Sequence, residues 1–258
     1  MSISKVKMVG NEKWEPIKGL DVQFYMNSTS GKFDVIATYN NALIKSVILE
    51  GGIATRASSL SLILRDLESA YAWYKRAIEI VDGSNIKNEL NHDYIEIDNL
   101  TISSEARAFF VASLTFYGKA FTEALGRKLK MEKKWLDQSF HEMHDDIIGY
   151  RHNFAAHSGS DSFEHAKTLL ILVPHPSKGL VYQPMTVRGQ LSMIITPERN
   201  MNELFEHAIE VVANKYTETL ERIRKYVFSL PGSYWVTSAG GSGVVNLDVV
   251  IKNKKVVK

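Results

Sequence analysis

Hydrophobic residues recur at intervals of three and four positions in four long stretches of the chain. This spacing places the apolar side chains on one face of a helix, so each stretch predicts an amphipathic helix packed on its neighbours. In the first stretch the pattern ends at DGSN, and in the last at LPGS, both of which are typical helix stops. The four predicted helices occupy about residues 58–82, 103–126, 133–157 and 200–230.

The pattern changes to short β-type runs in two other parts of the chain. In the N-terminal part, FDVIATYN predicts a strand, and the sequence from Asn41 through SVILEGG predicts a strand or a short helix. Between residues 166 and 196, the runs TLLILVPHP, GLVYQPM and QLSMIITP are separated by turn residues. These runs predict a hairpin or meander of two or three strands.

Together these elements predict a mainly α protein, a helical bundle of about four long helices with a small β hairpin or meander inserted before the last helix. We expect residues 1–57 to form an N-terminal segment of mixed structure packed on the bundle. The bundle itself covers residues 58–230 and includes the β insertion at 166–196, and residues 231–258 are expected to be a C-terminal linker and tail.

Composition narrows the class of protein. Hydrophobic residues make up 45% of the 258 positions and charged residues 23%, which is typical of globular proteins and excludes a disordered chain. The chain contains no cysteine, which excludes disulfides, thiolate zinc sites and cysteine nucleophiles. The first residues lack the apolar core of a signal peptide, and no stretch is long and apolar enough to span a membrane. We therefore expect a soluble cytoplasmic protein that does not bind membranes.

A net charge of +2 does not by itself indicate a nucleic-acid-binding protein. One segment, RKLKMEKK at 127–134, is strongly basic. Such a run usually forms a solvated helix connection, and its alternative role is contact with RNA phosphates through Arg127, Lys128 and Lys130.

Several conventional sites do not match. The sequence AGGSGVV lacks the Gly-Lys-Ser/Thr ending of a phosphate-binding loop, and HSGSD lacks the Gly-x-Ser-x-Gly elbow of a serine hydrolase. A metal site built from His141, His144, Asp145 and His152 remains an alternative, because these residues fall at helical offsets and their side chains suit zinc or iron. Their spacing matches no established motif, so a polar helix face is the simpler interpretation.

The sequence GYRHNFAAHSGSD, at the end of the third predicted helix, contains Arg151 and His157 six positions apart. On an ideal helix this separation corresponds to about 240° of rotation and about 9 Å of rise, which a long arginine side chain can cover. Asn153 lies between them, and His144 lies two turns before Arg151 on nearly the same face. The spacing alone does not identify a site.

In its context, however, this segment resembles the HEPN superfamily of helical-bundle proteins, in which an arginine near the end of a bundle helix is followed by a histidine four to six residues later. The match is most similar to the abortive-infection and toxin branch, with Arg151, Asn153, Ala156, His157 and Ser158 in the corresponding places. The resemblance implies a metal-independent endoribonuclease, without a cofactor, that acts as a toxin or phage-defence effector. It also implies an antitoxin or regulatory protein as a further partner.

The residue types suit the chemistry that this resemblance implies. Histidine, with an ordinary pKa near 6.5, can accept the proton of a ribose 2′-hydroxyl, and the arginine fork can stabilise the negative charge that develops on the phosphate. His157 and Arg151 are the expected catalytic residues, and Asn153 and His144 the expected supporting residues. Since one histidine leaves the acid for the leaving group unassigned, the resemblance implies a homodimer with the ends of the third helices facing each other.

Many HEPN proteins are not catalytic, so a second interpretation stays open. In this alternative the same bundle binds RNA, a nucleotide or a protein partner without cleaving it.

Overall fold

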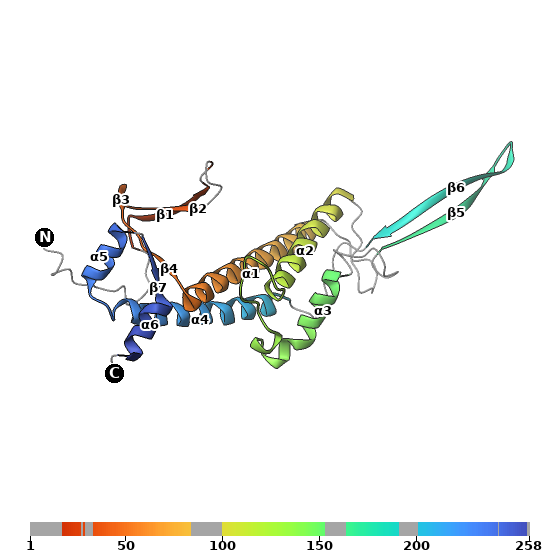
Figure 1. Ribbon diagram of the computed structural model, residues 1–258. Coiled ribbons are helices and arrows are strands. Elements are labelled where there is room, and N and C mark those ends of the chain that lie inside the picture. Colours follow the sequence, from red (N-terminus) through yellow and green to blue (C-terminus); the bar gives the residue numbers. More distant parts are fainter. Residues whose placement is uncertain are drawn as a thin grey trace. The chain divides into compact units, whose positions relative to one another are not determined.

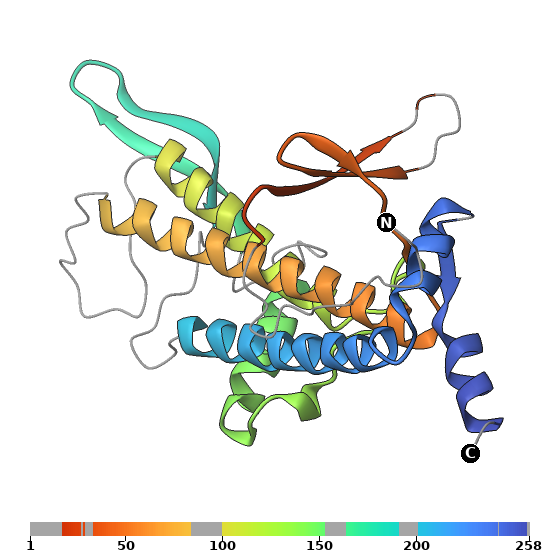
Figure 2. The same ribbon diagram turned by 90° about the vertical axis from the view of Figure 1, so that its left-hand side faces the viewer.

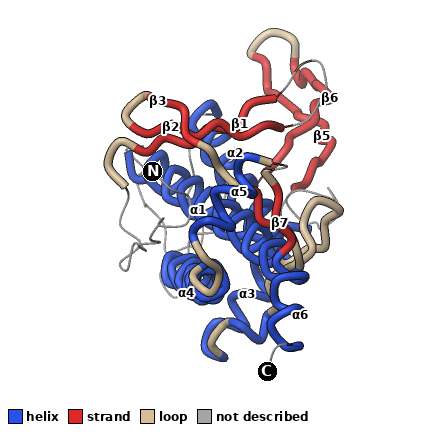
Figure 3. Tube along the Cα trace, turned by 60° about the vertical axis from the view of Figure 1, so that its left-hand side comes forward, coloured by secondary structure: helices blue, strands red, loops and turns tan. Residues whose placement is uncertain are grey.

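The computed structural model describes residues 17–26, 28, 33–83, 100–152, 164–190, 201–241 and 243–256. The protein is mainly α, as predicted (Figures 1 and 3). The helices in the described residues are α1 (Gly52–Gly83), α2 (Leu100–Ala120), α3 (His141–Arg151), α4 (Met201–Val227), α5 (Gly232–Gly240) and α6 (Leu247–Val256). The strands there are β1 (Leu20–Met26), β2 (Phe33–Tyr39), β3 (Ala42–Ile44), β4 (Ile48–Glu50), β5 (Glu164–His175), β6 (Gly179–Gln190) and β7 (Val244–Asn246). Within the described part of the chain, no helix has the length and apolar composition needed to cross a membrane.

The chain divides into two compact units. One contains the described residues up to Ser58 and from Tyr216 onward, and the other runs from Ser59 to Lys215. Both divisions fall inside helices, within α1 and within α4.

The unit from Ser59 to Lys215 has a core of helices that pack side by side (Figure 2). At its centre is Phe205 of α4, whose ring centroid lies 5.4 Å from those of Tyr74 on α1 and Tyr117 on α2. Burial of each large apolar side chain contributes about 1.5–3 kcal/mol. The buried side chains of α1 in this unit recur at the spacing that predicts the helix: Leu60, Ile63, Leu67, Ala70, Tyr74, Ala77 and Val81.

The other unit contains an antiparallel sheet in the order β1-β2-β3 and a parallel pair, β4 and β7. The strand predicted from FDVIATYN is confirmed as β2. The turn from β2 to β3 consists of Asn40 and Asn41 at φ 48° and 63°, left-handed values that a two-residue hairpin turn requires and asparagine tolerates.

The prediction of a linker and tail at 231–258 is wrong, because this segment contains α5, β7 and α6. The glycines and serines suggest a linker, but four apolar residues of the segment are buried. Trp235, Val245, Leu247 and Val250 belong to the core of this unit, and the Trp235 indole donates a 3.0 Å hydrogen bond to the Val227 carbonyl.

The second and third predicted helices differ from the observed ones at their ends. Helix α2 ends at Ala120 rather than at 126, and Leu125, expected on its apolar face, is fully exposed. Helix α3 begins at His141 rather than near 133, after two 3-10 turns at Lys133–Trp135 and Gln138–Phe140. The backbone of Leu136 and Asp137 is extended, and the Asp137 N–H donates a 3.1 Å hydrogen bond to Nε2 of His207, so a tertiary contact replaces the helical one.

In the part of the predicted insertion that the structure describes, two strands of 12 residues each, β5 and β6, form a hairpin (Figure 1). The third predicted run, QLSMIITP, lies outside the described residues after Gln190. The register of the hairpin runs from the Glu164–Gln190 pair to the His175–Gly179 pair beside the turn. Gly179, at φ 72°, adopts the left-handed conformation that favours glycine where the turn enters β6.

Candidate functional site

Arg151 is the last residue of α3, and α2 fixes the position of its side chain. Its aliphatic part lies on Gly118: a Cβ added to that glycine would overlap Cδ of Arg151 and lie 3.0 Å from Nε. Its Nη1 donates a long hydrogen bond, 3.4 Å, to the hydroxyl of Thr122. The absence of a side chain at position 118 therefore lets the arginine lie directly on the α2 backbone.

Arg151 is half-buried, and no carboxylate among the described residues lies within ion-pair distance of its guanidinium. Thr122 Oγ1, which accepts its hydrogen bond, donates to the carbonyl of Gly118 at 2.8 Å and so is itself held in place. The end of α3 thus presents a fixed positive charge that no described residue neutralises. Such a group can bind the phosphate of a nucleic acid.

His157 and Asn153 lie outside the described residues, so the distance from Arg151 to His157 stays a prediction. His157 follows the end of α3 by six positions.

His144 is buried against α2 and does not face solvent. Its Nδ1 lies 2.9 Å from the Tyr117 hydroxyl, and its ring centroid lies 4.4 Å from that of Phe121. Burial lowers the pKa of His144 below its usual 6.5, and this outweighs the opposite effect of the neighbouring Asp145. A neutral, buried ring fixes α3 on α2, so the support that His144 can give to Arg151 is positional.

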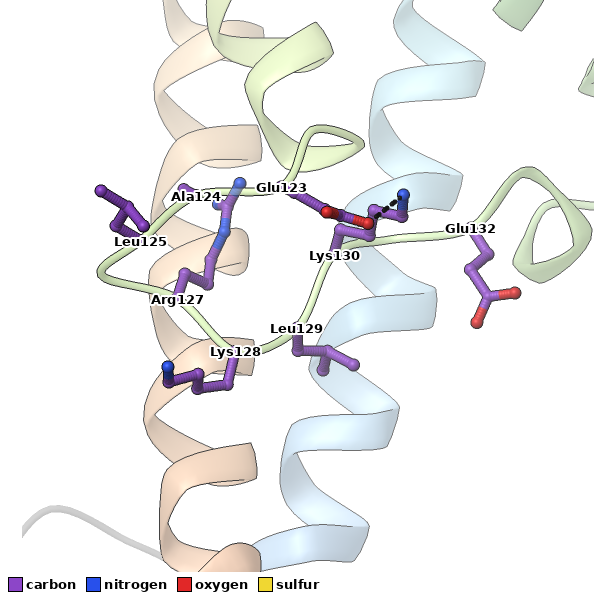
Figure 4. Close-up of a pocket in the computed structure, with 8 residues that line it drawn as sticks. All are labelled: Glu123, Ala124, Leu125, Arg127, Lys128, Leu129, Lys130 and Glu132. Atoms are coloured by element: carbon purple, nitrogen blue, oxygen red, sulfur yellow. Dashed lines mark hydrogen bonds and ion pairs between the residues drawn. The ribbon is translucent and has the colours of Figure 1, made fainter.

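The basic segment forms the loop after α2 and lines a pocket of about 560 Å³ (Figure 4). In this loop the side chain of Arg127 is buried, and its Nη1 donates a 2.8 Å hydrogen bond to the carboxylate of Asp66 on α1. Its Nη2 donates to the carbonyls of Lys119 and Thr122 at the end of α2. This side chain therefore caps α2 and joins the loop to α1, which explains why the helix ends early.

The phosphate contact expected of Arg127 is not supported, because Asp66 already neutralises its guanidinium. Two other basic side chains of the loop remain accessible. Lys128 is exposed, and Lys130 forms a 3.0 Å ion pair with Glu123 at the surface, where such pairs are weak (Figure 4). Of the three predicted phosphate contacts, the structure leaves these two lysines available.

The alternative metal site finds no support in the described part of the chain, where no group of three or more potential ligands comes together. Asp145 forms a 2.5 Å ion pair with Lys133, which holds the pKa of Asp145 below its usual range. His141 contacts the carbonyl of Leu136 at 3.2 Å.

Three residues that position the site were not predicted. Gly118 and Thr122 hold Arg151, and Asp66 holds Arg127. The available signal was Gly118 itself, because a glycine inside a helical pattern usually marks a close packing contact.

Comparisons of the chain with protein-family models, with the curated proteins and with the solved structures found no match.

Proposed function

We propose that the protein is a metal-independent endoribonuclease of the HEPN type, in which Arg151 and His157 cleave RNA and two helical bundles form a homodimer. The observation that carries the proposal is the guanidinium of Arg151, which α2 fixes at the end of α3 without a neutralising carboxylate among the described residues. This is the arginine that the sequence motif singles out.

In the proposed reaction, His157 takes the proton from a ribose 2′-hydroxyl, which then attacks the adjacent phosphorus. Arg151 stabilises the negative charge on the pentacoordinate phosphate, and the bond to the 5′-oxygen breaks. The products are a 2′,3′-cyclic phosphate and a 5′-hydroxyl, so the net reaction consumes no water. The second copy of the chain supplies the acid that protonates the leaving oxygen.

The loop after α2 extends the site toward the RNA backbone. Thr122, which accepts the hydrogen bond from Arg151, lies six residues before Lys128 on the same loop. Lys128 and Lys130 contact neighbouring phosphates in this proposal, which makes binding weaker at higher salt. The protein acts in the cytoplasm as a toxin or phage-defence effector, and an antitoxin or regulatory protein restrains it.

Incubation of the purified full-length protein with RNA in EDTA tests the proposal. We expect cleavage that survives chelation, cyclic-phosphate ends, and loss of cleavage in Arg151→Ala and in His157→Ala. His152→Ala is the matched control, because His152 is an exposed histidine next to Arg151 and the proposed reaction assigns it no role.

Unchanged cleavage by either the Arg151 or the His157 variant would refute the assignment. Tight RNA binding without cleavage would favour the alternative of a binding module. The position of Arg151 supports the nuclease and the binding module equally, since a guanidinium can bind a phosphate whether or not a catalytic base is present.

A further inference from the structure

Three cations surround the buried carboxylate of Asp66 on α1. Nη1 of Arg127 lies 2.8 Å from one of its oxygens, Oδ2, and both of these side chains are buried. The other oxygen, Oδ1, lies 2.9 Å from Nζ of Lys119 and 4.0 Å from Nη2 of Arg65. One negative charge is therefore shared by three positive charges.

Two of these positive charges are in excess, and their side chains reach the solvent. Arg127 and Asp66 neutralise each other inside the protein, whereas the side chains of Lys119 and Arg65 are 45% and 67% exposed. No second carboxylate in the described part of the chain lies within ion-pair distance of Lys119 or Arg65. Like charges this close repel each other, and a bound anion lowers that repulsion. The two exposed cations therefore favour an anion as their ligand.

A phosphate group matches the arrangement of these two cations. Nζ of Lys119 and Nη2 of Arg65 both lie within 4.0 Å of the same carboxylate oxygen, so the oxygens of a single phosphate can accept hydrogen bonds from both. The guanidinium supplies a planar donor fork and the ammonium a compact point charge, and both groups are common phosphate ligands in proteins.

Aromatic side chains lie beside the two cations. Nζ of Lys119 lies 5.0 Å from the ring centroid of Phe116 on α2, and this centroid lies 4.5 Å from that of Trp73 on α1. Both rings are half-buried, so part of each stays accessible. In sites for single-stranded nucleic acids, cations hold the backbone next to aromatic rings on which bases stack. These surroundings therefore fit a nucleic acid better than a free phosphate or a lipid headgroup.

The two cations adjoin the proposed RNA site at the end of α2. Thr122, whose hydroxyl accepts the hydrogen bond from Arg151, follows Lys119 by three residues. Nη2 of Arg127 donates to the carbonyls of both Lys119 and Thr122, which fixes the two residues relative to each other. Gly118, which contacts Arg151, and Lys119 lie about 100° apart around α2. A strand that passes the end of this helix can therefore contact both sides of it.

We propose that Lys119 and Arg65 form a second phosphate site, which binds the backbone of the RNA strand that Arg151 contacts. The identity of this strand rests on the proposed function, but the binding role falls on residues outside the proposed reaction. Lys119 and Arg65 hold one phosphodiester, and Trp73 and Phe116 offer an aromatic surface to a neighbouring base.

The variant Arg65→Ala tests the site with little risk to the fold, because Arg65 is mostly exposed and lies at the limit of ion-pair distance from Asp66. Arg76→Ala is the matched control. Arg76 follows Arg65 by 11 residues, which brings it back to nearly the same face of α1, and its side chain is also exposed. Its guanidinium already has a carboxylate partner, Glu79, at 3.1 Å. Both variants therefore remove one positive charge, but only Arg65→Ala removes one from the proposed site.

The measurement is the affinity of the full-length protein for a single-stranded 2′-O-methyl RNA, by fluorescence anisotropy over a series of salt concentrations. This RNA keeps the phosphodiester backbone but lacks the 2′-hydroxyl that the proposed cleavage needs. We expect Arg65→Ala to raise the dissociation constant roughly three- to five-fold, the effect of losing one exposed ion pair. The slope of log K against log salt should become shallower by about 0.7, the share of one phosphate on a single strand. Arg76→Ala should bind as the wild type does.

The variant Lys119→Gln provides a second test of the same site. Arg127 remains beside Asp66 in this variant, so we expect a folded protein with a similar rise in the dissociation constant and a similar change in the salt slope. Thermal unfolding shows whether the variant is folded. If it is not, the comparison of Arg65→Ala with Arg76→Ala decides.

Equal losses of affinity in Arg65→Ala and Arg76→Ala would overturn the proposal, because the effect would then reflect net charge alone. Wild-type affinity in Arg65→Ala, or no RNA binding by the wild type, would also overturn it. The same holds if Arg65 supports binding of anionic lipid vesicles or inorganic phosphate but not of the RNA.

Cleavage of unmodified RNA is recorded separately, so that the second site and the nuclease can fail independently. Binding that depends on Arg65 without any cleavage supports the phosphate site and refutes the nuclease. Cleavage by the wild type together with unaltered binding in Arg65→Ala refutes the phosphate site alone.

Discussion

Replacing Arg127 by alanine should destabilise the protein. The direct contacts of the folded protein with RNA phosphates should not change, because Arg127 is already paired with Asp66. The side chains of Arg127 and Asp66 are 4% and 2% exposed, and 2.8 Å separates Nη1 from the carboxylate oxygen. Removal of one member of such a buried pair typically costs about 3–5 kcal/mol, because the remaining charge loses its partner inside the protein.

The structure places the expected cost at the lower end of this range. Lys119 also lies 2.9 Å from the carboxylate of Asp66, so the carboxylate keeps one partner when Arg127 is removed. The variant also loses the two hydrogen bonds that cap the end of α2. We therefore expect a loss of about 3 kcal/mol, which for a chain of this size lowers Tm by roughly 6–12 °C.

Thermal and urea unfolding of the variant measure this loss, and Lys128→Ala is the control. Lys128 is exposed on the same loop, so its replacement should change the stability by less than about 0.5 kcal/mol and weaken RNA binding instead. If Arg127→Ala proves as stable as Lys128→Ala, the buried ion pair does not hold the loop. Reduced RNA affinity in a fully stable Arg127 variant would restore this residue as a phosphate contact.

Two further substitutions separate positioning from stability. Gly118→Ala should slightly stabilise α2, because alanine favours a helix by up to about 1 kcal/mol over glycine. The added methyl group should nevertheless displace the Arg151 side chain and so reduce RNA cleavage. Unaltered cleavage would show that the contact with Gly118 does not position Arg151. Because the pKa of His144 is lower in the folded chain than its usual 6.5, the unfolded chain binds the proton more readily, and stability falls as the pH drops below about 6.5. His144→Gln should therefore lose less Tm than wild type between pH 7 and pH 5, and equal losses would contradict the burial argument.

Helices α1 and α4 could be predicted from the sequence because a continuous apolar stripe determines them. The ends of α2 and α3 could not, because distant side chains decide them. Arg127 satisfies the carbonyls at the end of α2, and His207 accepts a hydrogen bond from the backbone of Asp137 before α3. The folded C-terminal segment was missed for a similar reason, since its buried apolar residues pack in one cluster with residues distant in sequence, among them Ile53 and Ala57.

The third helix predicted from the sequence contains Arg151, and so does α3, whereas the burial of Arg127 and its contact with Asp66 were not predicted. A run of basic residues looks solvated in the sequence, and nothing in its spacing points to an acidic partner 61 positions away. Asp66 therefore determines which of the two arginines, Arg127 or Arg151, is available to bind a phosphate.

Both arginines donate to Thr122 at the end of α2, Arg127 to its carbonyl and Arg151 to its hydroxyl. The negative end of the helix dipole stabilises both charges there. Asp66 neutralises only Arg127, so the end of α2 keeps one uncompensated guanidinium among the described residues, with Lys128 on the same loop. An anion that binds at this place therefore meets Arg151 first, and Asp66 determines which of the two arginines can serve as its ligand.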